Sequence, residues 1–356
     1  MMVEEWTGDQ QELIDDADLS EQAQLYEHFR IVADKGQEPL RVDKFLFEHL
    51  QHSSRNRIQK AAEAGFVHVN DRPVKSDYRV RPLDVVTLML DRPHYDDTIE
   101  PEEIPLNVVY EDDDLMVINK EAGMVVHPGC GNYHGTLVNA IAWHLRNHPD
   151  YDPNDPEVGL VHRIDKDTSG LLVVAKTPDA KTKLGVQFFN KTTCRSYNAL
   201  VWGNFVEEKG RIEGNIGRDP KDRLRMAVFP PDSEIGKSAV THYKVLERFG
   251  YVTLVECVLE TGRTHQIRAH MKHIGHPLFS DERYGGTEIL RGERSASYRA
   301  FIQNCFKICP RQALHARTLG FVHPRTGRQM DFTSEWPSDM AQLIEKWQRF
   351  ISHAES

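Results

Sequence analysis

A dense group of charged and polar side chains lies between two apolar stretches in residues 159–176. The second stretch, residues 171–175, is a run of leucine, valine and alanine that is typical of a strand buried on both faces. Residues 162–170, called the polar loop below, hold a histidine, an arginine, a lysine, two aspartates, a threonine and a serine. Such charges are costly to bury unless they are paired or used. The polar loop is therefore a candidate active site, and the alternative is a solvated turn with surface ion pairs.

Three segments of the chain match one set of motifs. Residues 162–171, HRIDKDTSGL, fit the pattern H-R-[L/I]-D-x-x-T-[S/T]-G-L at every defined position. Residues 194–203, CRSYNALVWG, fit basic-x-Y-x-A-hydrophobic-V-x-G, and residues 260–271, ETGRTHQIRAHM, contain T-G-R-x-H-Q-[I/L]-R-x-H. Over residues 38–340 the chain resembles the RluA/RluD-type RNA pseudouridine synthases. In a further family-like segment, Glu121 stands where that family usually has proline.

The resemblance implies an enzyme that breaks the bond from ribose to uracil N1 in RNA and remakes it at C5. This chemistry needs neither a metal nor a nucleotide cofactor, and the sequence holds no P-loop or dinucleotide fingerprint. Asp165 matches the family's catalytic aspartate, which acts by direct attack on the sugar or by removing a ribose proton. Either role needs an ionised carboxylate, which a neighbouring arginine favours. We expect Arg268 to be that neighbour, with Arg263 as the alternative.

The same resemblance assigns further residues to the site. Tyr197 matches the tyrosine that stacks on the uracil, and Arg163 matches the arginine that helps to fill the space left by a flipped base. We expect Ile267 and Leu278 to form an apolar pocket wall. The predicted site comprises catalytic Asp165, Tyr197 and Arg268 and substrate-binding His162, Arg163, Arg263, Ile267 and Leu278.

Residues 38–92 are predicted to form a small α/β module. Apolar residues recur at helical spacing in residues 42–50, a second helix follows at residue 55, and short strand-like segments come after it. The two helices followed by G-F-V-x-V-N resemble the S-four-type RNA-binding domain. By this resemblance the candidates for contact with RNA phosphates are Arg55, Arg57, Lys60, Lys75 and Arg79. The alternative is a solvated basic face.

The net charge of −10 does not oppose RNA binding, because it is concentrated at one end of the chain. Residues 1–38 hold eleven acidic and two basic residues, so the rest of the chain carries about −1. Residues 40–92 hold ten Lys or Arg against seven Asp or Glu, a net charge of +3. Local basic patches therefore decide whether RNA binds.

At 356 residues the chain is long enough for more than one domain. We expect an acidic, disordered tail over residues 1–37, the RNA-binding module over residues 38–92, a linker over residues 93–105 and the catalytic domain over residues 106–356. Periodicity alone predicts only an α+β fold. The resemblance adds a mixed, mostly antiparallel β-sheet with flanking helices and a central cleft.

Composition bears on metal ligands and on the cellular compartment. Four histidines in residues 265–276, and Cys305 with Cys309, are possible metal ligands, but their spacings do not match a zinc motif. Five cysteines and an N-terminus without the plan of a signal peptide indicate a reducing cytoplasm. No apolar run approaches the length of a membrane span.

Two other functions fit parts of the sequence. A non-catalytic RNA-binding or ribosome-assembly factor would use the basic module, but it has no need for a carboxylate at Asp165 facing a polyanion. A glycoside or nucleoside hydrolase would pair Asp165 with Asp167, whose separation in one loop is not obviously suited to that reaction. We predict an RNA-uridine isomerase that acts as a cytoplasmic monomer. Its expected substrate is large-subunit ribosomal RNA, with transfer RNA as the alternative.

Overall fold

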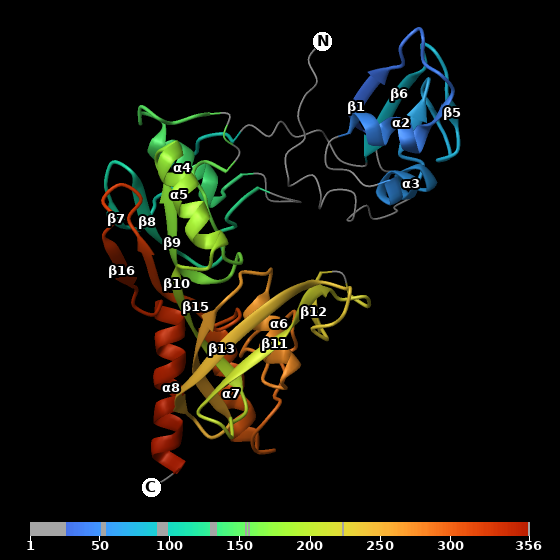
Figure 1. Cartoon of the computed structure of the whole chain (residues 1–356). Helices are drawn as coiled ribbons and strands as arrows, with labels where there is room; N and C mark the ends of the chain where they lie inside the picture. Colours follow the sequence, from blue (N-terminus) through green and yellow to red (C-terminus); the bar gives the residue numbers. More distant parts are fainter. Residues whose placement is uncertain are drawn as a thin grey trace. The chain divides into compact units, whose positions relative to one another are not determined.

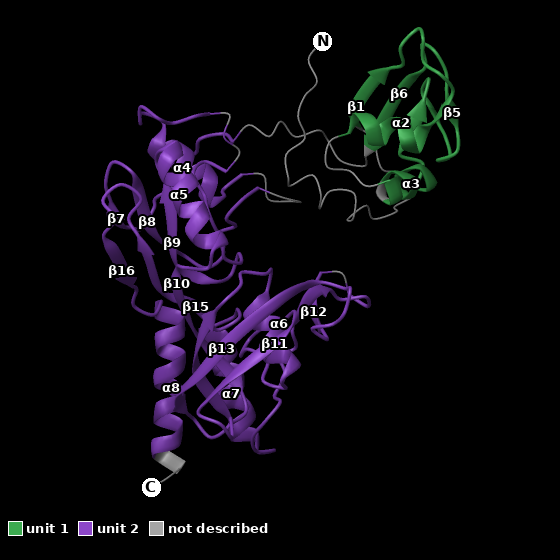
Figure 2. Cartoon of the chain, viewed as in Figure 1, with its two compact units in different colours: residues 1–98, 129–131 green, residues 99–128, 132–356 purple. Residues whose placement is uncertain are grey.

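A computed structural model of the chain describes residues 26–50, 55–90, 99–128, 134–153, 155, 157–222 and 224–354. The fold divides into two compact units, residues 1–98 with 129–131 and residues 99–128 with 132–356 (Figure 2). None of the helices in the described parts of the chain is both long and apolar enough to cross a membrane.

The smaller unit packs two helices on a small antiparallel sheet. Strands β1 (Tyr26–Val32), β6 (Val85–Leu90), β3 (Val67–Val69) and β4 (Arg72–Pro73) lie in that order, and β2 (Leu40–Arg41) pairs with β5 (Arg79–Val80). Helices α2 (Val42–His49) and α3 (Arg55–Glu63) bury Phe45, Leu46 and Ile58 in one core with Val67 and Val86. The apolar faces of the two helices, whose residues recur at the helical period, thus pack against the apolar face of the sheet, whose residues alternate along the strands.

Residues 26–32 form the edge strand β1, so the prediction of a disordered acidic tail through residue 37 is wrong for this part. β1 runs antiparallel to β6, and Phe29 and Ile31 pack against the core while Arg30 and Val32 are exposed. The high negative charge averaged over the first 37 residues concealed this short alternating segment. Residues 1–25 lie outside the described residues.

The larger unit is built on a ten-stranded sheet, and it confirms the predicted α+β class with a mixed, mostly antiparallel sheet. Its strands run in the order β12 (Met226–Phe229), β11 (Lys209–Arg218), β13 (Lys237–Arg248), β14 (Val252–Leu259), β10 (Cys194–Trp202), β15 (Leu314–Val322), β9 (Ser169–Ala175), β8 (Leu115–Lys120) and β7 (Val108–Glu111), and β16 (Gln329–Thr333) pairs with β15. Every pairing is antiparallel except that of β15 with β9.

Helices cover both faces of this sheet (Figure 1). The helices of the unit are α4 (Leu137–Leu145), α5 (Pro178–Phe189), α6 (Gln266–His273), α7 (Ala296–Ile308) and α8 (Ser338–Ala354). On one face, Leu172 and Ala199 pack with residues of α4 and α6. On the other face, Leu171 packs with α5 and Leu200 packs with α7 and α8. Because successive residues of a strand point to opposite faces, strands buried on both faces read as continuous apolar runs.

The larger unit begins before the predicted domain start at residue 106. The side chain of Ile99 is buried in its main core, and the backbone N–H of Glu102 donates to the carbonyl oxygen of Asn139 at 3.0 Å. The side chain of Asn139 in turn donates to the carbonyl oxygen of Glu100 at 2.8 Å. The linker prediction is therefore wrong for residues 99–105, because these contacts fix the segment to α4. Residues 91–98 lie outside the described residues.

Gly170, the last residue of the polar loop, is the second residue of β9, and two backbones come unusually close there. Gly170 has a φ of 118°, and a Cβ at this position would lie 2.2 Å from the carbonyl oxygen of Ala316 on β15. Only glycine adopts this conformation without strain, and only glycine leaves room for the neighbouring strand.

Gly170→Ala is expected to destabilise the larger unit by about 3 kcal/mol or more, because a methyl group there meets a backbone carbonyl in a strained conformation. Gly250→Ala is the matched control, since Gly250 also has a positive φ of 74° but has open space around its Cβ position. We expect that variant to lose about 1 kcal/mol. Chemical denaturation of both variants measures the difference, and equal losses would contradict the close-approach argument.

Candidate active site

A cleft of about 810 Å³ opens beside the polar loop in the larger unit. Its lining comes from the polar loop, the end of α5, strand β10 and residues 259–268. The cleft brings together seven of the eight predicted site residues: His162, Arg163, Asp165, Tyr197, Arg263, Ile267 and Arg268. Segments that are far apart in the sequence thus meet around Asp165.

Asp165 forms an ion pair with Arg268 at the edge of the cleft. Nη1 of Arg268 donates to Oδ2 of Asp165 at 3.1 Å, and the Asp165 side chain is 23% exposed. Among the described residues, no donor reaches Oδ1 of Asp165 in a hydrogen bond. One carboxylate oxygen is therefore held by the protein, and the other is available to a bound molecule.

Arg268 is fixed from its other side by Asp281, a residue that was not predicted to belong to the site. Nε and Nη2 of Arg268 donate to the two oxygens of Asp281 at 2.7 and 2.9 Å, and Asp281 is fully buried. Burial alone would lower the pKa of Arg268, but the hydrogen bonds and charges of Asp281 and Asp165 raise it above its ordinary value. Arg268 therefore stays charged. Asp281 lies 13 residues after Arg268, in a segment that fits the pattern G-H-P-hydrophobic-x-x-D-x-x-Y-G of the family that the sequence resembles, and this signal could have identified it.

Arg263 does not contact Asp165. Its Nε donates to the carbonyl oxygen of Ser238 at 3.2 Å, and it has no ion pair with the residues that the structure describes. Of the two arginines that the sequence left open, the structure places Arg268 against the carboxylate. Arg263 lines the cleft and faces its solvent side instead.

Leu278 was predicted to line the pocket, and this prediction is wrong. It is fully buried and forms an isolated β-bridge with Val201, so it belongs to the core beneath the site. The apolar wall of the cleft instead includes Ile267 and Leu314. Apolar character alone could not distinguish a core residue from a cleft residue.

The backbone of the polar loop is held by two buried cations. Nζ of Lys120, which ends β8, donates to the carbonyl oxygen of Lys166 at 2.8 Å. Nη1 of Arg311 donates to the carbonyl oxygen of Asp167 at 2.9 Å, while its Nε pairs with Asp339 at 2.7 Å. Burial lowers the pKa of Lys120 to about 7, and the charge of Asp167 opposes this shift. Neither cation was predicted as a site residue; a lysine that ends an apolar strand is a signal that could have identified Lys120.

Tyr197 and His162 form uncharged parts of the cleft wall. Burial raises the pKa of Tyr197, which is 7% exposed, so its phenol stays protonated at neutral pH. Burial lowers the pKa of His162 to about 3, so its imidazole is neutral. Nε2 of His162 accepts the backbone N–H of Val173 at 3.0 Å, and the ring stacks on Phe188 at 4.4 Å between centroids. His162 therefore links the polar loop to β9 and to α5.

His265 is a cleft residue that sequence reasoning considered only as a possible metal ligand. It stands in the left-handed region, with a φ of 52° and ψ of 24°, just before α6. Its Nδ1 lies 3.1 Å from Oη of Tyr284, and its Nε2 lies 4.0 Å from Oδ2 of Asp165. The nearby His270 and His276 instead bond to Thr241 and to the backbone of Trp202. The histidines therefore do not converge on one point.

A different group in the larger unit has side chains close enough for a metal, namely Asp112, Asp114 and His323. Arg325 donates to Asp114 at 2.6 and 2.9 Å, and His323 bonds to Asp112 at 2.8 Å. A guanidinium on one carboxylate competes with any cation. We assign this group to the hydrogen bonds that join the β7–β8 turn to residues 323–325.

The rim of the cleft carries exposed cations and an exposed aromatic ring. Arg163, Lys166 and Lys191 are exposed and form no ion pair with the described residues. Phe189, the last residue of α5, is 86% exposed. Nε of Arg195 is buried and has no hydrogen-bond partner among the described atoms. Unpaired cations next to an exposed ring are suited to phosphates and bases of a single strand.

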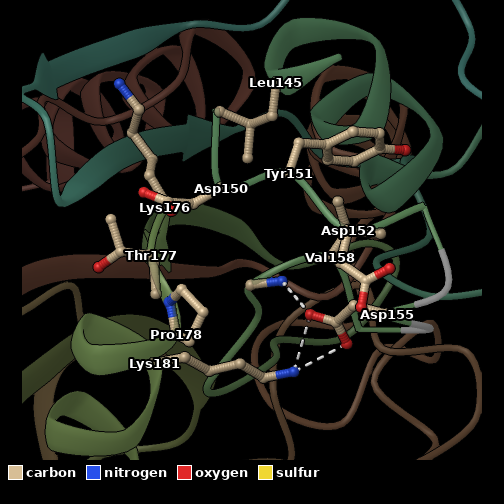
Figure 3. Close-up of a pocket in the computed structure, with 12 residues that line it drawn as sticks. Leu145, Asp150, Tyr151, Asp152, Asp155, Val158, Lys176, Thr177, Pro178 and Lys181 are labelled. Atoms are coloured by element: carbon tan, nitrogen blue, oxygen red, sulfur yellow. Dashed lines mark hydrogen bonds and ion pairs between the residues drawn. The ribbon is translucent and has the colours of Figure 1, made fainter. Parts of the chain in front are cut away.

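A second pocket, of about 330 Å³, lies at the start of α5 and does not include Asp165. Figure 3 shows Lys181 of α5 pointing toward Asp155, which it contacts at 2.8 and 2.9 Å. Asp155 also accepts the backbone N–H of Gly159 at 3.1 Å. These groups are occupied in holding the turn before the polar loop, so we assign the pocket to the fold.

The smaller unit presents most of its predicted RNA contacts to solvent. Lys60, Lys75 and Arg79 are exposed. Arg55 is half-exposed, but its Nη2 also donates to the buried Asp43 at 3.0 Å. The side chain of Arg57 lies outside the described residues. Arg55 therefore has a structural partner in addition to any RNA contact.

Comparisons with known proteins agree with this architecture. Residues 114–273 match the family described as RNA pseudouridylate synthase, and residues 40–86 match the S4 domain. A human protein titled RNA Pseudouridylate Synthase Domain Containing 4 shares the fold with a TM-score of 0.55 at 22% identity, over 68% of this chain and 93% of its own.

Curated relatives extend along nearly the whole chain. An uncharacterized RNA pseudouridine synthase of Chlorobaculum parvum is 46% identical over 90% of this chain and 98% of its own. The ribosomal large subunit pseudouridine synthase D of Pasteurella multocida is 41% identical over 86% of this chain and 90% of its own. The chain belongs to the family of RNA pseudouridine synthases, enzymes that isomerise uridine to pseudouridine, and it carries an S4 RNA-binding domain.

Proposed function

We propose that this enzyme isomerises specific uridines of large-subunit ribosomal RNA, with Asp165 as its catalytic group and the target base flipped into the cleft. The observation that carries the proposal is the ion pair of Asp165 with Arg268, which is itself held by the buried Asp281. The choice of ribosomal RNA is supported by the name of the relative from Pasteurella multocida. Such a substrate places the enzyme in the cytoplasm.

The reaction begins with the bond between C1′ of ribose and N1 of uracil. The Asp165 carboxylate attacks C1′, or it removes a ribose proton to give a glycal, and in both routes the uracil leaves with the electron pair of the bond. In the first route C5 of the uracil displaces the Asp165 oxygen from C1′; in the second, C5 bonds to C1′ of the glycal while Asp165 returns the proton to C2′. In both routes the proton on C5 is then lost and N1 gains a proton. The free Oδ1 of Asp165 and the fixed Oδ2 give the carboxylate a defined direction for either route.

The detached uracil must remain in place while it turns. Tyr197, buried in the cleft wall and protonated at neutral pH, supplies a ring on which the base stacks. Ile267 and Leu314 add apolar surface to the same pocket. Arg163 is exposed on the polar loop, where it can fill the space that the flipped base leaves in the RNA.

The other functions have less support. A hydrolase that pairs two carboxylates would use Asp167, but Asp167 is not among the residues that line the cleft. A non-catalytic binding factor needs the cations of the rim but not a buried arginine that forms an ion pair with Asp165. Gene deletion and the Asp165→Asn variant distinguish the hydrolase and the binding factor from the isomerase.

Deleting the gene is expected to remove specific pseudouridines from large-subunit ribosomal RNA, and a copy with Asp165→Asn should not restore them. Carbodiimide-dependent reverse-transcription stops on total RNA locate the marks. Asp167→Asn is the matched control, and it should restore every mark. If the lost marks lie in transfer RNA, the substrate proposal is wrong; if Asp165→Asn restores them all, the catalytic assignment is wrong.

Arg268→Lys is expected to lower kcat by about 10²-fold, because an ammonium keeps the charge but cannot bond Asp281 and Asp165 with a planar fork. Arg263→Lys is the control, because Arg263 has no contact with Asp165; it should change KM rather than kcat. Single-turnover kinetics on ribosomal RNA, with melting temperatures of both variants, compare the two. If both variants lost the same share of kcat, the proposed role of Arg268 in holding Asp165 would be contradicted.

Phe189→Ser is expected to weaken RNA binding by about 1–3 kcal/mol with little change in kcat, because a stacked base loses its ring. Val206→Ser is the control, since Val206 is 94% exposed and does not line the cleft. Lys191→Gln should weaken binding and lower the salt slope by about one ion. Filter binding at several salt concentrations measures all three, and equal effects of the two serine variants would exclude a stacking role for Phe189.

A further inference from the structure

His265 lines the cleft beside Asp165, and its ring carries one hydrogen that makes no hydrogen bond with the described residues. Its Nδ1 lies 3.1 Å from Oη of Tyr284, and this oxygen also accepts the backbone N–H of Met226 at 2.8 Å. Among the described residues, the Tyr284 hydroxyl has no acceptor other than Nδ1 of His265. The hydroxyl hydrogen is therefore assigned to that bond, which makes Nδ1 an acceptor and puts the imidazole hydrogen on Nε2.

Nε2 of His265 lines the cleft and lies 4.0 Å from Oδ2 of Asp165. This distance is too long for a direct hydrogen bond. An oxygen atom of a bound molecule can accept from Nε2 while another part of the same molecule meets the free Oδ1 of Asp165. The donor thus points to the region in which Asp165 acts.

The imidazole is neutral in this position. Burial lowers the pKa of His265 to about 4, Asp165 opposes the shift, and Arg268 adds to it. Arg283 also lowers this pKa and Asp281 also raises it. Since the pKa lies well below neutrality, His265 offers an N–H at neutral pH but is not an acid that gives up a proton.

We propose that Nε2–H of His265 donates a hydrogen bond to an oxygen beside the glycosidic bond of the target uridine, either O2 of uracil or the 2′-oxygen of ribose. The inference rests on the proposed function of Asp165. Both oxygens lie next to the C1′–N1 bond, and both are acceptors.

A neutral donor suits the chemistry of this step. When the C1′–N1 bond breaks, its electron pair passes to the uracil, and the negative charge spreads over N1 and the carbonyl oxygens. A hydrogen bond to O2 strengthens as this charge develops, which stabilises the transition state. An imidazolium would instead protonate the departing base, and a protonated uracil is a poorer nucleophile at C5. A bond to the 2′-oxygen would orient the ribose toward Asp165.

The backbone supports the assignment of a function to this side chain. Left-handed φ values are uncommon for residues other than glycine, and they collect at sites where the surrounding structure imposes them. Here the conformation turns His265 toward Asp165 immediately before α6 begins at Gln266. Asparagine tolerates the same conformation and keeps an N–H donor, whereas phenylalanine keeps the ring shape and removes the donor.

The test compares His265→Phe, His265→Asn and Tyr284→Phe with the wild type on large-subunit ribosomal RNA transcribed with [5-³H]uridine, from which pseudouridine formation releases tritium. His265→Phe should lower kcat about 10²-fold with little change in KM, and His265→Asn should recover part of that loss. Tyr284→Phe should lower kcat less, and the double variant should equal His265→Phe, because Tyr284 acts by positioning His265. Melting temperatures identify losses that come from folding.

The pH profile separates a donor from a proton-transfer group. His265→Asn should give a lower kcat with the same dependence on pH between pH 6 and 9 as the wild type, since His265 keeps its charge state throughout that range. A profile that loses one limb in the variant would show that His265 transfers a proton and would overturn the proposal. A wild-type enzyme that releases no tritium would overturn the proposed function itself, whereas an active wild type with an equally active His265→Phe overturns only this inference.

Single-atom substitutions distinguish the two oxygens. Synthetic RNAs of the mapped site carry 2-thiouridine or 2′-fluoro-2′-deoxyuridine at the target, and nucleoside chromatography measures their conversion. If O2 is the acceptor, the thio substitution should slow the wild type more than His265→Phe, and the fluoro substitution should slow both equally. The opposite pattern identifies the 2′-oxygen. If neither substitution affects the wild type more than the variant, the hydrogen bond to uridine does not exist.

Discussion

The buried guanidinium of Arg268 determines the geometry of the cleft. Asp281, fully buried, accepts two of its donors, so Nη1 is left to point toward Asp165 in one direction. The planar fork of arginine makes this division possible, because its donors diverge at fixed angles. Removing one partner would leave a buried charge unpaired, at a cost of about 3–5 kcal/mol. The contact that attaches α6 to residue 281 therefore also holds the carboxylate of the site.

The backbone of the polar loop is likewise fixed by hydrogen bonds from buried side chains. Lys120 and Arg311 each donate to one of its carbonyl oxygens, and both cations are buried. Carbonyl oxygens that point away from solvent need donors, and these two side chains supply them. Because the loop leads directly into β9, which is buried along its whole length, the backbone on both sides of Asp165 is fixed. The Asp165 side chain is thus carried by a loop that cannot easily shift.

The motifs predicted most residues that surround Asp165, because each motif lies in or next to a strand or helix whose apolar pattern could be recognised. The choice between Arg263 and Arg268 could not be made from spacing, since it depends on α6 beginning at Gln266 and turning the later arginine inward. Leu278 was misassigned because apolar character does not distinguish a core residue from one that lines the cleft. The sequence also could not predict where the His265 side chain points, because a left-handed backbone conformation determines its direction. The sequence motifs thus predicted which residues belong to the site better than they predicted how those side chains are oriented.

An acidic chain can bind a polyanion where its local charge is favourable. Residues 1–38 carry most of the net charge of −10, so the remaining chain is close to neutral. Within the larger unit, cations away from the cleft such as Lys181 and Arg325 are neutralised by neighbouring carboxylates. Arg163 and Lys191 at the cleft have no such partner among the described residues. A phosphate that approaches these cations does not have to displace a carboxylate first, which favours binding at the cleft rim.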